Sequence, residues 1–554
     1  MARVLLVDDD PEQLAIRGLL LESEGHQVVP AGSADEASRA YLETLPAVVL
    51  MDLRLPHTSD GLGLIRRIRA HSAAVRILVL SGWPADLEHS PEAVLVDVCL
   101  QKPANTGRLL ELVGRLAVCL LCWLGALAGV AHGASSFKVR LEAPAEVVAT
   151  LEMSSPGSSW ERAGAEAAVA EVFVDDRRPF HVVLYAGAEP YRYRTFLGKL
   201  AAGEHTLRVE RSSGHSAAGS GLNVSGARFD AIDAGNPLYR ILLHAPVLFA
   251  RPDTVGRFSD VPLLVYGEEL REGGGTTLQY TALFSNEDGG TSTRALMARW
   301  GRTTDIEYVY RVRLDGAGRP ARGTIQGRDH KEVPFDGRRE DHHPLLMPFT
   351  ANNMITAAAD SPLRFQPAPI LAELARGSRE QVMDEHPVTY RVMAAELARE
   401  GRVRPFGVVD GDKISDARNY LYLEARVVNR DARVAAVARA RGEGRWRASH
   451  LGRVDYAIDR SGWIRTTIEL DPGTPAAGIA EIGFQCLAEP AGKDKPAAVA
   501  GLCRIEEVSR CFLLDRDWRP GADFWKLDPK PGGVAIPTGE MLAFDVAAWS
   551  SRSK

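Results

Sequence analysis

The sequence predicts a multidomain protein that starts with an α/β domain on a parallel sheet and continues in mainly β domains with few helices. Three observations support this prediction. A chain of 554 residues is too long for one hydrophobic core and corresponds to about three or four domains. Short apolar runs alternate with helical periodicity over residues 1–115. From Phe137 onward the pattern changes to strand-like alternation broken by Gly, Pro and Ser turns.

The overall charge is ordinary for a soluble protein. The net charge is -6 and 25% of the residues are charged, without a Lys/Arg run long enough to follow a phosphate backbone. We therefore expect no nucleic acid partner. The six cysteines lie in unlike places, and no Cys/His spacing is typical of a zinc site.

The first domain is organised around Asp52. Residues 47–52 form an apolar run that ends in this single carboxylate, and Pro46, Pro56 and Gly61 bound the run. These boundaries favour a buried strand of a parallel sheet over a helix. In such a sheet, ligands bind at the carboxyl ends of the strands.

The remaining elements of this domain alternate in type. Further strands are expected at 3–7, 27–30, 75–80 and 98–101. Helices are expected at 11–24, 33–45 and 61–70, after Pro84, and from about Asn105 past Leu112. Ser33 and Glu36 have the spacing of a capping box. The domain should therefore contain five strands and five helices.

Chemically useful side chains follow four of these strands. They are Asp8, Asp9, Asp52, Ser81 and Lys102. Right-handed crossovers bring all the carboxyl ends to one edge of the sheet, so these groups should converge. Carboxylates that repel one another are best relieved by a divalent cation with oxygen ligands, which favours Mg²⁺. One carboxylate can then attack phosphorus while the cation, the lysine and the hydroxyl stabilise the transferred oxygens, giving an acyl phosphate.

This pattern resembles the receiver domain of two-component response regulators over residues 1 to about 115. The matching motifs are Val7-Asp8-Asp9-Asp10, Met51-Asp52-Leu-Arg-Leu-Pro56, Ser81-Gly82 and Lys102-Pro103. The resemblance implies a flavodoxin-like (βα)5 fold. It also implies a phosphorelay in which Asp52 takes a phosphoryl group from a histidine kinase or phosphotransfer protein, with no other enzymatic activity in this domain.

The resemblance also implies a role for each remaining residue of the set. The Mg²⁺ ligands would be Asp8, Asp9, Asp52 and the backbone carbonyl of Arg54. Ser81 would be the switch hydroxyl, Lys102 would pair with the phosphoryl group, and the bond before Pro103 would be cis. Cys99 departs from the family pattern, because receivers usually carry an aromatic residue three positions before the lysine. That aromatic residue reports phosphorylation, so the output step is left open.

An apolar segment without formal charge, residues 116–134, follows the first domain. Arg108 and Arg115 precede it and small residues end it, which is the pattern of a signal peptide. Three interpretations are open. The segment is a signal anchor that keeps the receiver in the cytoplasm and exports residues 135–554 to the periplasm or the outside. Alternatively it is a buried helix of one soluble protein, or two reading frames have been joined, the second encoding a secreted protein.

The rest of the chain is expected to be β-rich. Residues 135–211 fit a small β-sandwich, the Ser/Gly-rich start of residues 212–236 suggests a linker, and residues 237–554 should form two domains. Within the last range, strands are expected at 238–249 and 452–458, among others.

Two further features concern residues 387–400 and the late cysteines. Residues 387–400 have the periodicity of an amphipathic helix. If this part of the chain is exported, Cys486, Cys503 and Cys511 should supply one disulfide and one leftover thiol.

Two polar clusters in this portion raise other functions. The loop 286–288 could hold Ca²⁺ with Asp305, although an acidic turn is favoured because the ligand ladder of a calcium loop is missing. His330, His342 and His343 could form a metal or acid/base site, and this would suggest an extracellular metal-dependent hydrolase. Adjacent strand residues point to opposite faces, which favours a plain polar loop.

Three functions are therefore carried forward. The first is a phosphorelay protein joined to an exported or membrane-anchored β-rich portion. The second is a secreted binding or surface protein joined to a receiver by fusion of reading frames, and the third is the hydrolase. Residues 135–554 contain no nucleophile elbow, P-loop, dinucleotide fingerprint or HExxH motif.

Overall fold

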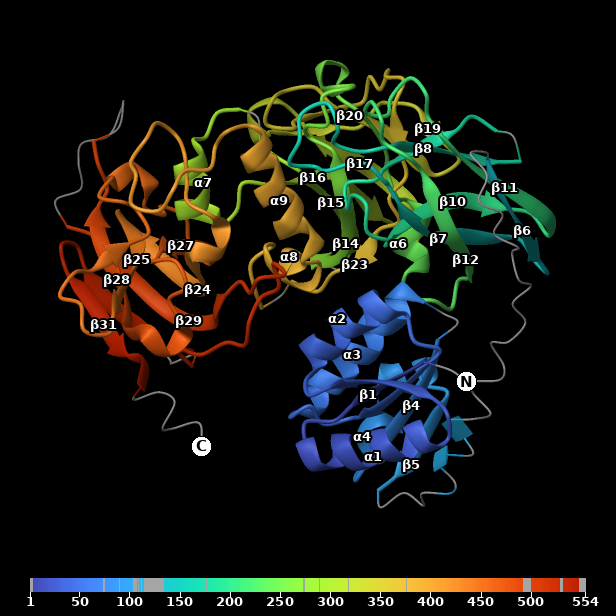
Figure 1. The fold of residues 1–554 in the computed structure, drawn as a ribbon, viewed down its shortest axis with the longest axis horizontal. Helices are drawn as coiled ribbons and strands as arrows, with labels where there is room; N and C mark the ends of the chain where they lie inside the picture. Colours follow the sequence, from blue (N-terminus) through green and yellow to red (C-terminus); the bar gives the residue numbers. More distant parts are fainter. Residues whose placement is uncertain are drawn as a thin grey trace.

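The computed structural model describes most of the chain (Figure 1). The described residues are 3–547 without 73–74, 89, 103–106, 108, 111, 114–133, 176, 273–274, 288, 317, 375, 492–499 and 529–531. The expected signal or anchor segment 116–134 lies outside the described residues, apart from Ala134. Among the residues that are described, no helix has both the length and the apolar character needed to cross a membrane.

The N-terminal domain contains the expected five-stranded parallel sheet. Its strands are β1 (Arg3–Val7), β2 (Gln27–Ala31), β3 (Val48–Asp52), β4 (Arg76–Ser81) and β5 (Val98–Gln101). They are ordered β2-β1-β3-β4-β5 and every neighbouring pair is parallel. The order places β3 at the centre of the sheet, between β1 and β4.

Helices cover both faces of this sheet. They are α1 (Pro11–Ser23), α2 (Ala34–Thr44), α3 (Thr58–His71), the short α4 (Ala85–Glu88) and the 3-10 helix η1 (Pro91–Leu95). The fourth expected helix is thus reduced to one turn followed by a 3-10 turn. The fifth falls largely outside the described residues, but 107, 109–110 and 112–113 are helical. Ser33 caps α2 by accepting from the amide of Glu36, as expected.

The apolar strands of this domain are buried on both sides. Alternate residues such as Val49 and Met51 face a core shared with α2 and α3. Their neighbours Val48 and Leu50 face a second core shared with α1 and Leu109. Burial on both faces explains why these strands read as continuous apolar runs rather than as alternating ones.

One glycine is required where α3 crosses the end of β3. A Cβ atom on Gly61 would lie 2.0 Å from the backbone oxygen of Leu53. Only glycine allows the helix to approach the loop after Asp52 this closely.

Residues 135–232 form two antiparallel sheets. One contains β10 (Tyr191–Leu200), β7 (Ala145–Ser154) and β12 (Asn223–Ile232). The other contains β6 (Ser135–Leu141), β11 (Gly203–Arg211), β8 (Val169–Val174) and β9 (Phe180–Val183). The linker predicted at 212–236 is therefore wrong for its second half, because β12 pairs with β7 along its length. The Ser/Gly-rich composition stops near residue 221, and backbone pairing rather than composition decides the rest.

The middle of the chain adds two more sheets. The longer one is ordered β18-β17-β16-β15-β14-β23. Its strands are β18 (Glu332–Pro334), β17 (Pro320–Gln326), β16 (Asp305–Leu314), β15 (Gly275–Phe284), β14 (Pro262–Glu272) and β23 (Ile370–Leu371). The other contains β19 (Arg339–Glu340), β20 (His343–Pro348), β13 (Val247–Phe249) and β22 (Arg364–Phe365), with β21 (Ile355–Thr356) paired to β20.

Four helices accompany these sheets. They are α6 (Tyr239–Leu243), α7 (Thr293–Trp300), α8 (Gln381–Glu385) and α9 (Val388–Arg399). The strand predicted at 238–249 is wrong in its first half, which forms α6. A short apolar run fits either element, and here Ile241 packs so closely on Gly267 that a Cβ there would lie 2.4 Å from it. Helix α9 confirms the amphipathic helix predicted at 387–400.

The C-terminal part contains two four-stranded sheets around a separate core. The first contains β27 (Gly462–Glu469), β24 (Tyr420–Arg430), β29 (Leu502–Leu513) and β30 (Val534–Pro537). The second contains β26 (Arg447–Ala448), β25 (Ala432–Ala440), β28 (Ile479–Ala488) and β31 (Met541–Asp545). The strand predicted at 452–458 is wrong, because Leu451 and Gly452 have positive φ and start a turn that leads into a 3-10 helix, η5 (Val454–Tyr456).

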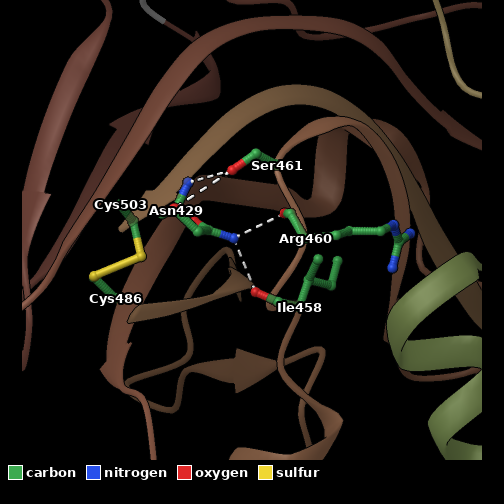
Figure 2. The surroundings of a disulfide bond; sticks show 6 residues. All are labelled: Asn429, Ile458, Arg460, Ser461, Cys486 and Cys503. Carbon is green, nitrogen blue, oxygen red and sulfur yellow. Dashed lines mark hydrogen bonds between the residues drawn. A yellow bond between two sulfur atoms is a disulfide. The ribbon is translucent and has the colours of Figure 1, made fainter. Parts of the chain in front are cut away.

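A disulfide joins the two C-terminal sheets. Cys486 of β28 bonds to Cys503 of β29, and Cys511 is a buried free thiol. Figure 2 shows that Asn429 lies beside this bond and donates from its side chain to the backbone oxygens of Ile458 and Arg460, at 3.0 Å each. The expected combination of one disulfide and one leftover thiol is confirmed.

Removing this disulfide should destabilise the C-terminal part by about 3 kcal/mol, because a closed loop of this length restricts the unfolded chain by that amount. The two cysteines are 17 positions apart. Thermal unfolding of the oxidised protein, with and without reductant, measures the effect. The double variant Cys486→Ala/Cys503→Ala is the control, and a shift caused by reductant in that variant would contradict the assignment.

The N-terminal domain contacts the β-rich portion through α2 and α3, and α2 lies on the side of this domain that faces the sheets in Figure 1. Arg67 pairs with Glu385 at 3.3 Å. In addition, a guanidinium nitrogen of Arg194 lies 2.6 Å from Nδ1 of His71. Residues from both parts line a cavity of about 490 Å³. The N-terminal domain and the β-rich portion are therefore in direct contact.

Candidate functional site

Three carboxylates meet at the carboxyl edge of the N-terminal sheet. Asp8 and Asp9 follow β1, and Asp52 is the last residue of β3. One oxygen from each lies within 4.8 Å of the others. Asp8 is buried, with 1% of its surface exposed, whereas Asp9 is open to solvent. The three acids therefore lie close together, as the sequence predicts.

Lys102 lies between two of these acids. Its Nζ is 2.7 Å from Oδ2 of Asp52 and 3.5 Å from Oδ2 of Asp8. Lys102 follows β5, and its backbone amide donates to the carbonyl of Ser81 at 2.8 Å. The end of β5 is thus tied to the end of β4, which fixes where the lysine side chain begins.

Arg17 is a further member of the site that the sequence did not reveal. Its guanidinium, on α1, forms a salt bridge with Oδ2 of Asp8. The other oxygen of Asp8 accepts from the amide of Asp10 at 3.1 Å. A signal was available, because Arg17 lies at helical spacing between Leu14 and Leu21, and both leucines pack into the core. A charge in such an apolar stripe points to a partner inside the domain.

The loop after β3 places Arg54 beside the central acid. Its backbone amide donates to Oδ1 of Asp52 at 3.3 Å. Its side chain turns outward, pairs with Asp86 at 3.0 Å and lies 4.3 Å from the ring centre of Trp83. Only the backbone of Arg54 therefore belongs to the acid site.

Ser81 ends β4 at the same edge. It is buried, and its hydroxyl oxygen accepts from the amide of Trp83 at 3.1 Å. Cys99 is half-buried on β5 and packs against the core on the α3 side. The cis bond expected before Pro103 lies outside the described residues, whereas the bond between Leu55 and Pro56 is cis.

The donor set fits a hard divalent cation. Carboxylate oxygens are the ligands that Mg²⁺ prefers, and neighbouring ligands in its octahedral shell lie about 2.9 Å apart. The three acids are within 4.8 Å of one another, so small side-chain rotations would close them on an ion. Lys102 and Arg17 offset part of the negative charge of these acids.

The described residues do not bring the three histidines of the predicted hydrolase site together. His343 is buried, lies 2.8 Å from the carbonyl of Ala245 and stacks on Phe196. His330 and His342 are exposed, and no group of three metal-ligating side chains in the described parts of the chain contains any of these histidines. The hydrolase prediction has no support from this arrangement.

The calcium loop prediction falls partly outside the described residues, because Asp288 is not described. Asp305 is buried and accepts from the side chain of Asn353 at 3.1 Å. Within the described residues, Asp305 belongs to none of the candidate metal groups.

Comparison with known proteins gives a family match for the N-terminal domain. Residues 4–114 match the model of the response regulator receiver domain. The virulence transcriptional regulatory protein PhoP of Salmonella typhimurium strain LT2 is 40% identical over 91 residues, which cover 16% of this chain and 40% of that protein. The same protein from Shigella flexneri is 40% identical over 79 residues, or 14% and 35% of the two chains. The chain thus spans less than half the length of these relatives.

Solved receiver structures are also similar to this part of the chain. The response regulator TrrA of Thermotoga maritima, in complex with Mg(2+)-BeF, is 25% identical with a TM-score of 0.20, over 21% of this chain and 99% of that one. A receiver domain protein of Clostridium thermocellum is 22% identical, also with a TM-score of 0.20, over 22% and 96% of the two chains.

Proposed function

We propose that the receiver domain of the two-component response-regulator type at residues 4–114 accepts a phosphoryl group on Asp52. The observation that carries this proposal is the position of Lys102 between Asp52 and Asp8, with Asp9 beside them. A carboxylate oxygen of Asp52 attacks phosphorus, the bond from phosphorus to the donor breaks, and its electron pair leaves with the donor. The product is an acyl phosphate.

Lys102 and Ser81 have separate tasks in this step. Before transfer, Lys102 neutralises Asp52, to which it is hydrogen-bonded at 2.7 Å. After transfer, the negative charge lies on the phosphoryl oxygens, and the ammonium group follows that charge. Ser81 supplies a hydroxyl from the neighbouring strand end, where it can donate to the same oxygens.

The cofactor proposed for this site is Mg²⁺. Its ligands would be the carboxylates of Asp8, Asp9 and Asp52 and the backbone carbonyl of Arg54. When bound, the ion screens the three acids from one another and from the incoming phosphoryl group. Asp8 is held by Arg17 and by the amide of Asp10, so its orientation toward Asp52 is set before any ion arrives.

The proposed phosphodonor is a histidine kinase or a phosphotransfer protein. No nucleic acid partner is proposed, since the relatives named as transcriptional regulators match only the N-terminal domain. The test is incubation of the purified chain with a small phosphodonor and Mg²⁺. The expected product is an acid-stable, base-labile phosphate on Asp52, and a chain that forms no such adduct would exclude the proposal.

For the rest of the chain we propose export, with the receiver left in the cytoplasm and residues 116–134 acting as signal or anchor. The disulfide between Cys486 and Cys503 supports export, because such bonds persist in oxidising compartments. The contacts between α3 and the β-rich portion, such as Arg67 with Glu385, favour the opposite arrangement, in which one chain stays in one compartment.

Fractionation of cells that express the whole gene with a C-terminal tag separates these arrangements. Under the export proposal, the tag appears outside the cytoplasm, either on a fragment that starts near Ala134 or on an anchored chain whose receiver is protected from external protease. A full-length chain of 60.2 kDa in the cytoplasm, with Cys486 and Cys503 reduced, would contradict export.

A further inference from the structure

A second group of metal-ligating side chains lies far from the receiver site in the sequence. Glu171, His181 and His215 each place one ligand atom within 4.8 Å of the other two. His181 is buried, and Glu171 and His215 are half-buried. Two imidazoles and one carboxylate are the donor set of many zinc sites, whereas the receiver site contains carboxylates alone.

Two of the three residues are fixed by strand pairing. Glu171 of β8 lies directly opposite His181 of β9 in the antiparallel register, so both side chains project from the same face of the sheet. Nε2 of His181 is 4.0 Å from Oε1 of Glu171. On the other side of β8, Glu210 of β11 is opposite Glu171 and is hydrogen-bonded to Arg208 at 2.6 Å.

The third residue comes from a loop that is tied to the same strand. The backbone amide of Ser212 donates to the carbonyl of Val169 at 2.8 Å, and the amide of Val169 donates to the hydroxyl of Ser216 at 2.9 Å. His215 lies between these two anchors. Its ring centre is 5.7 Å from that of His181, in an edge-to-face arrangement.

Hydrogen bonds around His215 leave one of its nitrogens available. The hydroxyl of Ser212 donates to Oε1 of Glu171 at 2.6 Å, so its oxygen accepts from Nδ1 of His215 at 3.0 Å. The neutral ring then carries its lone pair on Nε2. A ligating histidine typically donates from its other nitrogen in this way.

One of the two neutral tautomers of His181 also carries a free lone pair on Nε2. Its Nδ1 lies 3.3 Å from the carbonyl and 3.2 Å from the amide of Arg364. Donation to the carbonyl leaves Nε2 free for a ligand, whereas acceptance from the amide places the proton on Nε2. The guanidinium of Arg364 does not compete for Glu171, since it pairs with Glu340 at 2.9 Å.

We propose that Glu171, His181 and His215 bind a zinc ion through one carboxylate oxygen and one nitrogen of each imidazole. Ligand atoms of tetrahedral zinc lie about 3.4 Å apart. The present spacing of up to 4.8 Å closes to that value by small rotations of the half-buried side chains. The fourth position is left for water. His215 also lines a small pocket with Ser259 and Asp260.

The test measures zinc binding to the full chain in excess Mg²⁺, which occupies the receiver acids. In competition with a chromophoric chelator, the wild type should bind one equivalent of Zn²⁺ at this site. His215→Ala should weaken that binding about 100-fold or more, and the isosteric Glu171→Gln about 10-fold or more. The exposed His342→Ala is the matched control and should leave the affinity unchanged.

Two further measurements distinguish loss of the zinc site from misfolding of the variant and from zinc binding elsewhere in the chain. Zn²⁺ should raise the unfolding midpoint of the wild type and of His342→Ala, but not that of His215→Ala. Co²⁺ bound to the wild type should show the visible absorption of a tetrahedral site, and Glu171→Gln should lose it while its metal-free midpoint stays unchanged. A wild type that binds no Zn²⁺, or equal affinity in all the variants, would overturn the proposal.

Discussion

Replacing Asp52 by asparagine should abolish phosphorylation of the chain completely. The amide of Asp52→Asn is not a nucleophile at neutral pH, and its oxygen can still accept from Lys102, so the fold of the site is kept. The measurement is incorporation of phosphate from a small phosphodonor in the presence of Mg²⁺. Chelation of Mg²⁺ should have the same effect on the wild type, because Asp8 and Asp9 would then repel the incoming group.

Two variants make the result specific. Asp86→Asn removes a carboxylate from the same edge of the domain, where Asp86 pairs with Arg54 at 3.0 Å and accepts from the hydroxyl of Thr58 at 3.2 Å. Phosphorylation should persist in this variant. Lys102→Ala should slow it strongly, because charge on the transferred oxygens loses its cation. If Asp52→Asn still formed a base-labile adduct, another carboxylate would be the acceptor, and the assignment of Asp52 as the phosphoacceptor would be wrong.

Replacing Arg465 by methionine should destabilise the C-terminal part by about 3 to 5 kcal/mol, which lowers its unfolding midpoint by roughly 10 °C. Arg465 of β27 has no exposed side-chain surface and pairs with Asp384 at 2.7 Å and with Glu424 at 3.0 Å. Burial by itself lowers the pKa of Arg465, but the two carboxylates outweigh this effect and raise the pKa well above its usual value. Without this guanidinium, Asp384 and Glu424 remain buried with less positive charge beside them.

The location of this ion cluster explains why the effect should be large. Asp384 lies on α8, outside the C-terminal sheets, and also accepts from Arg510 of β29 at 3.0 Å. Arg465 and Arg510 therefore connect the C-terminal sheets to the helices of the middle region. Asp384→Asn should lower the midpoint by a smaller amount, because it removes a charge and keeps the acceptor oxygen.

Arg453→Met is the control for this prediction. Arg453 pairs with Asp455 at 2.7 Å, but both side chains are 59% exposed. Exposed pairs contribute little to stability, so the unfolding midpoint should not change measurably. Equal shifts for Arg465→Met and Arg453→Met in calorimetry would show that burial does not decide the strength of these pairs.

The receiver site was predictable because its chemistry lies at strand ends. Asp8, Asp52, Ser81 and Lys102 each follow a run of apolar residues, and the parallel sheet brings the ends of such runs together. Arg17 was missed, because helical spacing shows that a residue faces inward but not which group it meets. The helix after Pro84 was predicted, but its shortening to the single turn of α4 was not, since one turn carries no periodicity.

The zinc-binding group could not be found in the same way. Glu171 and His181 belong to separate strands, and only the register of β8 with β9 makes them opposite. His215 stands in a Ser/Gly-rich stretch whose composition suggested a linker. Its position depends on hydrogen bonds that Val169 forms with the backbone amide of Ser212 and with the side-chain hydroxyl of Ser216, and nothing in the local sequence indicates those bonds.

The sequence by itself determined the strand and helix order of the receiver, the acids at its active edge, and the change to β structure after residue 134. These features follow from periodicities of two and of 3.6 residues and from turn residues, which act over a few neighbours. Tertiary structure alone decided that Arg17 meets Asp8, that β12 pairs with β7, that residues 239–243 coil into α6, and that Glu171, His181 and His215 converge. Each of these depends on pairing between residues distant in the chain, which is selected by burial and hydrogen bonding in the assembled fold.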